Sequence, residues 1–141
     1  MNNSKARSFV TITITIAIVA LLLRFGIENL IKFNIKQNEE NAVNTLNSIS
    51  TALENYAKNN VGIYPVSLAI LTQTKPQYLT VDYTVVSPVK GYVYTFSRLD
   101  PYGYSCRATP DRCSVTGKSI YTITTGGIKM PPESCSKKEE S

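Results

Sequence analysis

The sequence predicts an α+β protein in which one long N-terminal α-helix packs on a small antiparallel β-sheet head. The first observation is an apolar run at residues 9–23, FVTITITIAIVALLL. The second is that the chain continues from this run to residue 60 without a proline, with the spacing of an amphipathic helix. The third is that the remaining chain holds short alternating segments separated by glycine and proline, the pattern of strands and turns.

The apolar half of this helix is predicted to cross a membrane. Residues 9–23 would extend about 22 Å as a helix, short of the roughly 30 Å hydrocarbon core of a bilayer. Extension to residue 33 spans the core and takes in Arg24, Glu28 and Lys32, which share one face at i, i+4 and i+8 and can pair along it. The residues expected to form the transmembrane or assembly surface are Phe9, Val10, Ile12, Ile14, Ile16, Ile18, Val19, Leu21, Leu22 and Leu23.

The Thr-Ile alternation at residues 11–16 has the period of a strand, which is the alternative interpretation of this run. In lipid, an isolated strand leaves its backbone groups without hydrogen bonds, whereas a helix satisfies its own. A helix also lets each threonine hydroxyl bond back to a carbonyl one turn earlier. We therefore predict a membrane helix rather than a strand or a buried core helix.

The second half of the helix is predicted to pack on the head through one apolar face. The residues of this face recur in steps of three and four: Ala42, Leu46, Ile49, Leu53 and Tyr56. Polar residues are expected on the opposite, solvent-facing side: Glu39, Asn44, Asn47, Ser48, Glu54 and Lys58. A coiled-coil seam is the alternative, but fewer than three clean heptads are present. Asn59, Asn60 and Gly62 are expected to end the helix.

The head is predicted to contain one short helix and a few antiparallel strands. Ser67 is the expected N-cap of the short helix, with Leu68 and Leu71 facing the core. Strands are expected at residues 91–99, 104–108, 119–124 and 128–130, with turns at residues 100–103 and 126–127. Pro131 and Pro132 are expected to end regular structure.

These elements divide the chain into five parts. We expect a basic leader or cytoplasmic tip at residues 1–8, a transmembrane helix at 9–33, an amphipathic half-helix at 34–60, a β-rich head at 61–132 and a polar tail at 133–141. Outside the helix only about eighty residues remain, enough for one small head and no second domain.

Composition argues against catalysis and against a nucleic-acid groove. The chain has no His, so Ser or Cys nucleophiles lack their usual base. No paired carboxylates, phosphate-binding glycine loop or Ca²⁺ loop is present. The net charge of +5 is spread along the chain without a basic block. We predict no enzymatic activity, no cofactor and no metal, and we disfavour nucleic acid as a partner.

Three cysteines lie in the last third of the chain: Cys106, Cys113 and Cys135. No CxxC motif occurs, so a zinc site is disfavoured. In a small head beyond a membrane segment we expect one disulfide and one remaining thiol. All three pairings are open. A bridge to Cys135 would fasten the C-terminal segment to the sheet, whereas a Cys106–Cys113 bridge would close a short loop.

The N-terminal residues, MNNSKARS, are short and basic and together with the apolar run imitate a secretory signal peptide. No small-x-small cleavage site follows Leu23, so we expect the apolar run to be kept. Lys5 and Arg7 taken alone favour an N-terminus on the cytoplasmic side, whereas Arg24, Lys32 and Lys36 on the other flank oppose it. The orientation therefore depends more on the cysteines of the head.

This order of segments resembles that of type IV pilins and the pseudopilins of type II secretion. Residues 52–79, ALENYAKNNVGIYPVSLAILTQTKPQYL, are similar to the family's passage from long helix to Tyr-Pro turn, Ser-Leu helix and Tyr-Leu. Residues 91–97, GYVYTFS, and 119–129, SIYTITTGGIK, resemble its strands and glycine turn. The resemblance covers most of the chain. It implies a pilin-like fold and assembly into a filament through the N-terminal helix.

The resemblance also implies partners and a location. These partners are the membrane, other copies, other pilin-like subunits, a prepilin peptidase and an assembly platform. The expected location is the bacterial inner (cytoplasmic) membrane, crossed once, with the head on the periplasmic or extracellular side, or a surface filament. The glycine and the glutamate of the family's cleavage motif align with Ser8, before Phe9, and with Thr13. The serine at position 8 affects leader removal, and the threonine at position 13 affects the contact that usually aligns neighbouring subunits.

Two functions are therefore expected from the sequence. The first is a structural subunit of a type IV pilus or a type II secretion pseudopilus. The second is a single-pass, membrane-anchored module that binds a ligand, such as DNA, without polymerising. The sequence does not distinguish pilus from pseudopilus, or a major from a minor subunit.

Overall fold

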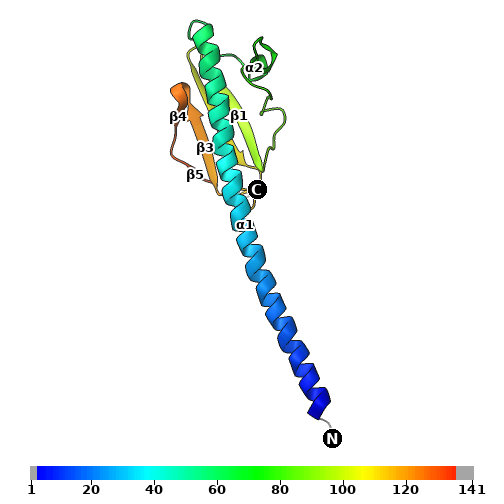
Figure 1. The fold of residues 1–141 in the computed structure, drawn as a ribbon. Coiled ribbons are helices and arrows are strands. Elements are labelled where there is room, and N and C mark those ends of the chain that lie inside the picture. The colour runs from blue at the N-terminus through cyan, green and yellow to red at the C-terminus, as the bar shows by residue number, and fades with distance from the viewer. Residues whose placement is uncertain (1–2, 136–141) are drawn as a thin grey trace, which may run out of the picture. The chain divides into compact units, whose positions relative to one another are not determined.

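A computed structural model describes the backbone of residues 3–135 and the side chains of residues 9–135. Helix α1 (Asn3–Asn59) runs without interruption through the apolar run and the amphipathic half (Figure 1). The chain forms two compact units, residues 1–34 and residues 35–141, and the division falls inside α1. The predicted α+β class is confirmed, because the second part of α1 packs on a small antiparallel sheet.

The Thr-Ile alternation at residues 11–16 is helical, as predicted, and its threonines show why. The Thr13 hydroxyl donates to the Phe9 carbonyl at 2.9 Å, and the Thr15 hydroxyl donates to the Thr11 carbonyl at 2.8 Å. The hydroxyls of Thr13 and Thr15 are thereby satisfied inside their own helix, which suits a segment with few other polar partners.

Helix α1 ends at Asn59 with a left-handed cap. Val61 and Gly62 have φ of 57° and 78°, and the Gly62 amide donates to the Ala57 carbonyl at 2.8 Å. This bond spans six residues, as in a Schellman cap. Glycine accepts the left-handed conformation readily, whereas the β-branched Val61 adopts it at a cost.

The sheet is an antiparallel meander whose strands follow chain order. Its strands are β1 (Tyr92–Asp100), β2 (Gly103–Pro110), β3 (Ser119–Thr124), β4 (Ile128–Lys129) and β5 (Glu133–Ser134). The path is β1-β2-β3-β4, and β5 also pairs with β3. Asp100 pairs with Gly103 across the predicted first turn. The turn after β3 is the 3₁₀ helix η1 (Thr125–Gly127), at the predicted glycine pair.

The core lies between the second part of α1 and one face of the sheet. Helix residues Ala42, Leu46, Ile49 and Leu53 are buried, and Tyr56 is half-buried against Tyr78. The sheet contributes alternate residues along its strands: Tyr92, Tyr94, Tyr104, Cys106, Ala108 and Ile123. The helical stripe therefore meets a face that is rich in tyrosine, and the tyrosine rings supply much of the buried volume.

Three details of the head differ from the sequence-based predictions. Ser67 is not the cap of the short helix α2 (Ala69–Gln73), whose N-cap is Leu68 and has no side-chain cap bond. Regular structure does not end at Pro131–Pro132, because β5 follows and pairs with β3 at Ser119 and Ile120. The expected polar tail therefore begins with two residues of strand. The rest of that tail, residues 136–141, lies outside the described residues.

Two acidic residues expected on the solvent side of α1 instead bond to the head. Glu39 accepts a hydrogen bond from the Lys118 amide at 2.9 Å, and Glu54 accepts bonds from three groups. Each lies at the margin of the apolar stripe, where a side chain reaches over the edge of the packed face. The face of α1 that contacts the head is thus wider than the stripe.

Candidate functional site

The first candidate site is the apolar surface of α1 between residues 9 and 33. Its large hydrophobic side chains are all exposed: Phe9, Val10, Ile12, Ile14, Ile16, Ile18, Val19, Leu21, Leu22, Leu23, Phe25, Ile27, Leu30, Ile31 and Phe33. They lie all around the helix rather than along one stripe. A helix that is apolar on every side is typical of a membrane span or of a helix surrounded by other helices.

One helix in the part of the chain that the structure describes is long and apolar enough to cross a membrane. This is α1, and the qualifying stretch begins at Phe9. The expected leader junction between Ser8 and Phe9 lies within the helical backbone. The Thr13 hydroxyl donates to the Phe9 carbonyl of its own helix.

Three charged residues interrupt this apolar surface on one face. Arg24 Nε lies 3.6 Å from Glu28 Oε1, one helical turn away, and both side chains are solvent-exposed. Lys32 follows one turn further on. The pairing predicted from the i, i+4 spacing therefore forms between the first two members.

The second candidate site is a polar cluster at the η1 end of the head, organised by Glu54. Its carboxylate accepts hydrogen bonds from the Tyr64 hydroxyl at 2.9 Å, the Tyr104 hydroxyl at 3.1 Å and the Gly126 amide at 2.8 Å. The Tyr104 hydroxyl also lies 2.8 Å from the Ser50 hydroxyl. One helix side chain thus holds the turn after α1, strand β2 and η1 together.

The environment of this cluster favours neutral tyrosines. Burial, and then the neighbouring Glu54 carboxylate, raise the pKa of Tyr64 to about 12. Burial is also the main cause that raises the pKa of Tyr104. A general base or nucleophile needs a pKa near the working pH, so these groups are suited to holding structure together.

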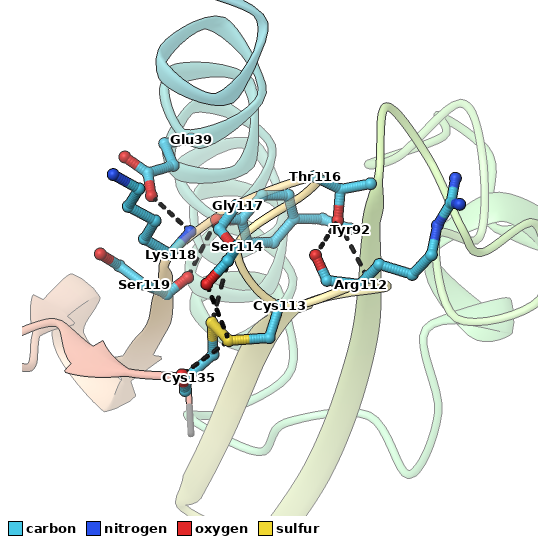
Figure 2. The surroundings of a disulfide bond; sticks show 10 residues. All are labelled: Glu39, Tyr92, Arg112, Cys113, Ser114, Thr116, Gly117, Lys118, Ser119 and Cys135. Carbon is cyan, nitrogen blue, oxygen red and sulfur yellow. Dashed lines mark hydrogen bonds between the residues drawn. A yellow bond between two sulfur atoms is a disulfide. The ribbon is translucent and has the colours of Figure 1, made fainter. Parts of the chain in front are cut away.

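The third candidate site is the loop closed by the disulfide, shown in Figure 2. Cys113 and Cys135 form the bridge, with a Cα–Cα distance of 5.7 Å. Of the three pairings left open by the sequence, this one fastens the segment after β5 to the loop after β2. The Cys135 amide also donates to the Lys118 carbonyl at 2.9 Å, so the connection is made by backbone as well as by sulfur.

The same loop is joined to α1 and to the core. The Asn38 side-chain amide donates to the Thr116 carbonyl at 3.0 Å. The Glu39 carboxylate accepts a hydrogen bond from the Lys118 amide at 2.9 Å (Figure 2). The Tyr92 hydroxyl donates to the Ser119 carbonyl at 2.9 Å. Gly117 packs directly against the Tyr92 ring, where any Cβ would clash with the hydroxyl.

Cys106 is the remaining thiol and lies buried in β2. Burial raises its pKa to about 12, so it stays protonated at neutral pH. A thiol of this kind is a poor nucleophile, which fits a packing role.

A small apolar groove lies where α1 passes β3 and β4. Its volume is about 230 Å³. It is lined by Val43, Leu46, Asn47, Tyr121, Thr122, Ile123, Lys129, Met130 and Pro132. Among the described residues, no group of three or more His, Cys, Asp or Glu side chains is placed to hold a metal ion.

Comparison with known protein families, with curated proteins and with solved structures found no match for this chain.

Sequence reasoning missed Glu54 and Glu39 as anchors of the head, and it left the cysteine pairing open. A weak signal for Glu54 existed. Ser50, Glu54 and Ala57 recur at helical spacing beside the main stripe, and Ser50 and Ala57 are buried. The partners of Glu54 come from distant parts of the chain, so no local pattern could identify them.

Proposed function

We propose that this chain is a membrane-anchored, pilin-like structural subunit that assembles through its N-terminal helix into a filament of the type IV pilus or type II secretion pseudopilus kind. The observation that carries the proposal is the contrast within α1. Its large apolar residues between 9 and 33 are exposed, whereas its stripe from Ala42 to Leu53 is buried under the head.

An apolar helix that is exposed on all sides has two stable environments in a cell. It can lie in lipid, or it can lie among other apolar helices. A subunit anchored in a bilayer can exchange the first environment for the second by joining a bundle of copies. A head-to-tail contact of this kind does not close on itself, so it propagates as a fibre.

The disulfide supports a location outside the cytoplasm for the head. Structural disulfides persist in oxidising compartments, such as the bacterial periplasm and the cell exterior. A single crossing by α1 with the head on that side agrees with the basic residues Lys5 and Arg7 before the span. The proposed location is the bacterial inner membrane, with an assembly platform as a partner.

The proposal includes a departure from the family at Thr13. The family's glutamate contacts the new N-terminus of a neighbouring subunit, whereas the Thr13 hydroxyl bonds to Phe9 of its own helix. This subunit therefore needs another polar contact to align it with its neighbours. Ser8 in place of glycine favours retention of residues 1–8.

Expression of the full-length chain in a bacterium with a type IV pilus or type II secretion system tests the proposal. We expect the chain in the membrane fraction, and in sheared filaments when the system is active. Intact mass would show whether residues 1–8 are kept, and whether two hydrogens are missing because of the disulfide. A chain that stays monomeric in detergent and never enters filaments contradicts the proposal.

The second candidate function is a single-pass binding module that does not polymerise. The groove beside β3 favours it, because small-ligand sites are concave and mostly apolar. This candidate predicts a membrane-bound monomer whose head binds a small apolar ligand, with a Met130→Lys change in the groove abolishing binding.

A further inference from the structure

Arg24, Glu28 and Lys32 form a row of alternating charge along one side of α1, here called the charged row. Arg24 and Glu28 already form an ion pair at 3.6 Å. None of the described residues forms an ion pair with Lys32. The row carries two cations and one anion, and these are the charged residues of the sequence between residues 9 and 34.

The row lies within an apolar surface, so covering that surface also covers the charges. Leu23, Ile27 and Ile31 are exposed and lie directly beside the row. A cation removed from water without a partner is strongly destabilising, because its lost hydration is not replaced. The one anion of the row, Glu28, is already paired with Arg24, so a contact between helices at this level is stabilised by a further anion near Lys32.

A second copy of this chain carries the required anion at a defined level. Copies inserted in one membrane by the same route share one orientation, so their helices are parallel. With no axial shift, each charge of the row lies level with the same charge on the other copy, and all three pairs repel. With a shift of eight residues, Arg24 lies level with Lys32, which also repels.

A shift of four residues, about 6 Å along the axis, makes both facing pairs attractive. Arg24 of one copy then lies level with Glu28 of the other, and Glu28 lies level with Lys32. We propose that Lys32 of each subunit pairs with Glu28 of the next, so that the charged row binds a second copy of the chain with a four-residue stagger. The inference rests on the proposed filament and identifies the polar contact that aligns its subunits.

The contact is directional, and this explains how it propagates. Each subunit presents Lys32 and Glu28 to one neighbour and Glu28 and Arg24 to the other, so the same contact repeats from copy to copy. Copies that lie at one depth in a bilayer are in register, where like charges face each other. The row therefore opposes association in the membrane and favours it once a neighbour is displaced along the axis.

Charge exchange between copies tests the inference. The full-length chain is purified in detergent, the detergent is removed, and self-association is measured by sedimentation and electron microscopy. Glu28→Lys places a second ammonium group against Lys32, and Lys32→Glu places a second carboxylate against Glu28. Each variant alone should associate more weakly than the wild type by about a hundredfold to a thousandfold, the loss expected from breaking a buried ion pair.

An equal mixture of the two single variants should associate more strongly than either variant alone, although the lysine introduced at position 28 still lies level with Arg24 of the next copy. In alternating copies, the carboxylate introduced at position 32 faces the ammonium group introduced at position 28, and the unaltered Lys32 faces the unaltered Glu28. Glu40→Lys, the same substitution at an exposed position of the head unit, is the matched control and should associate as the wild type does. Thermal unfolding of the head should be the same in all variants.

The outcomes separate this inference from the proposed function. Wild type that never self-associates overturns both. Wild type that forms filaments while either single variant associates equally well overturns the charged-row contact alone. A mixture that associates no more strongly than the single variants also overturns it, because the loss would then come from each helix itself.

Discussion

Two parts of helix α1 carry the same kinds of side chain in opposite environments. Leu22 is 63% exposed and Leu53 is 0% exposed, and Ile27 is 56% exposed while Ile49 is 1% exposed. The apolar part, residues 9–33, obtains its helical stability from its own backbone bonds and depends on an outside apolar phase. The head-packed part obtains an apolar environment from the chain itself. Both parts of α1 are helical, and they differ in what covers their apolar side chains. The head covers those of one part, and an apolar phase outside the chain must cover those of the other.

The largest expected effect is on folding, and only substitutions in the head-packed part of α1 should produce it. Leu53→Ala removes a fully buried side chain and should lower the free energy of unfolding of the head by about 2–5 kcal/mol. Leu22→Ala, the matched change in the apolar part, should leave that free energy unchanged. Urea unfolding of the full-length chain in detergent, followed by tyrosine fluorescence, measures both. Equal losses for the two variants would mean that the parts do not differ in burial.

Membrane retention should depend on the apolar part of α1 and not on the head. Leu21→Lys places a cation in the middle of the apolar part, where it opposes insertion by about 2.5–3.5 kcal/mol. We expect a clear fall in the membrane-bound fraction after alkaline extraction. Val61→Lys adds the same charge at an exposed position of the head and should leave the fraction unchanged. Full retention of the Leu21→Lys chain would remove the membrane role of this part.

The disulfide should stabilise the head and leave the apolar part unaffected. It closes a loop across 22 residues of sequence, and loops of this size correspond to about 3 kcal/mol in the chain-entropy description. The double variant Cys113→Ser/Cys135→Ser should therefore unfold at lower urea, and its membrane-bound fraction should stay the same. Thiol labelling of the native wild type should be negligible, and one thiol, Cys106, should react after unfolding. Labelling of more than one thiol in the unfolded, unreduced chain would contradict the bridge.

Alkaline pH should weaken the head through Tyr64. Its pKa is raised from 10.0 to about 12 in the folded chain, by burial first and by Glu54 second. Well below pH 10.0 both states keep the proton, so Tyr64 contributes no pH dependence there. Between pH 10.0 and about 12 the unfolded chain loses a proton that the folded chain retains, so the free energy of unfolding falls as the pH rises. Tyr64→Phe should make this fall shallower, and an unchanged slope would contradict the assignment.

The smallest expected effect is a gain in stability at the end of α1. Val61 is exposed and has φ of 57°, a left-handed conformation that disfavours β-branched residues. Val61→Gly should stabilise the head by about 1 kcal/mol. Val66→Gly, at another exposed valine without positive φ, is the control and should show no gain. A loss of stability at position 61 would show that the side chain matters more than the backbone strain.

Local patterns predicted most of the elements because those elements depend on near neighbours. The spacing of three and four residues between Ala42, Leu46, Ile49 and Leu53 predicts one apolar face of a helix, regardless of which segment packs on that face. The alternation of β1 and the residues of the first turn likewise act within a few positions of one another. The short helix α2 was predicted less well. Its cap is Leu68 rather than Ser67, since packing of Leu68 and Leu71 sets its start more than a side-chain bond does.

By itself, the amino-acid sequence determined that one long helix begins apolar and becomes amphipathic, and that a small antiparallel sheet follows, because periodicity and turn residues act locally. Only the tertiary structure decided which cysteines pair, that residues 133–134 extend the sheet, and that Glu54 and Glu39 face the head. Each of these depends on groups that are distant along the chain, and their distances are set by how the whole sheet packs on the helix. A pattern confined to one segment contains no information on such distances.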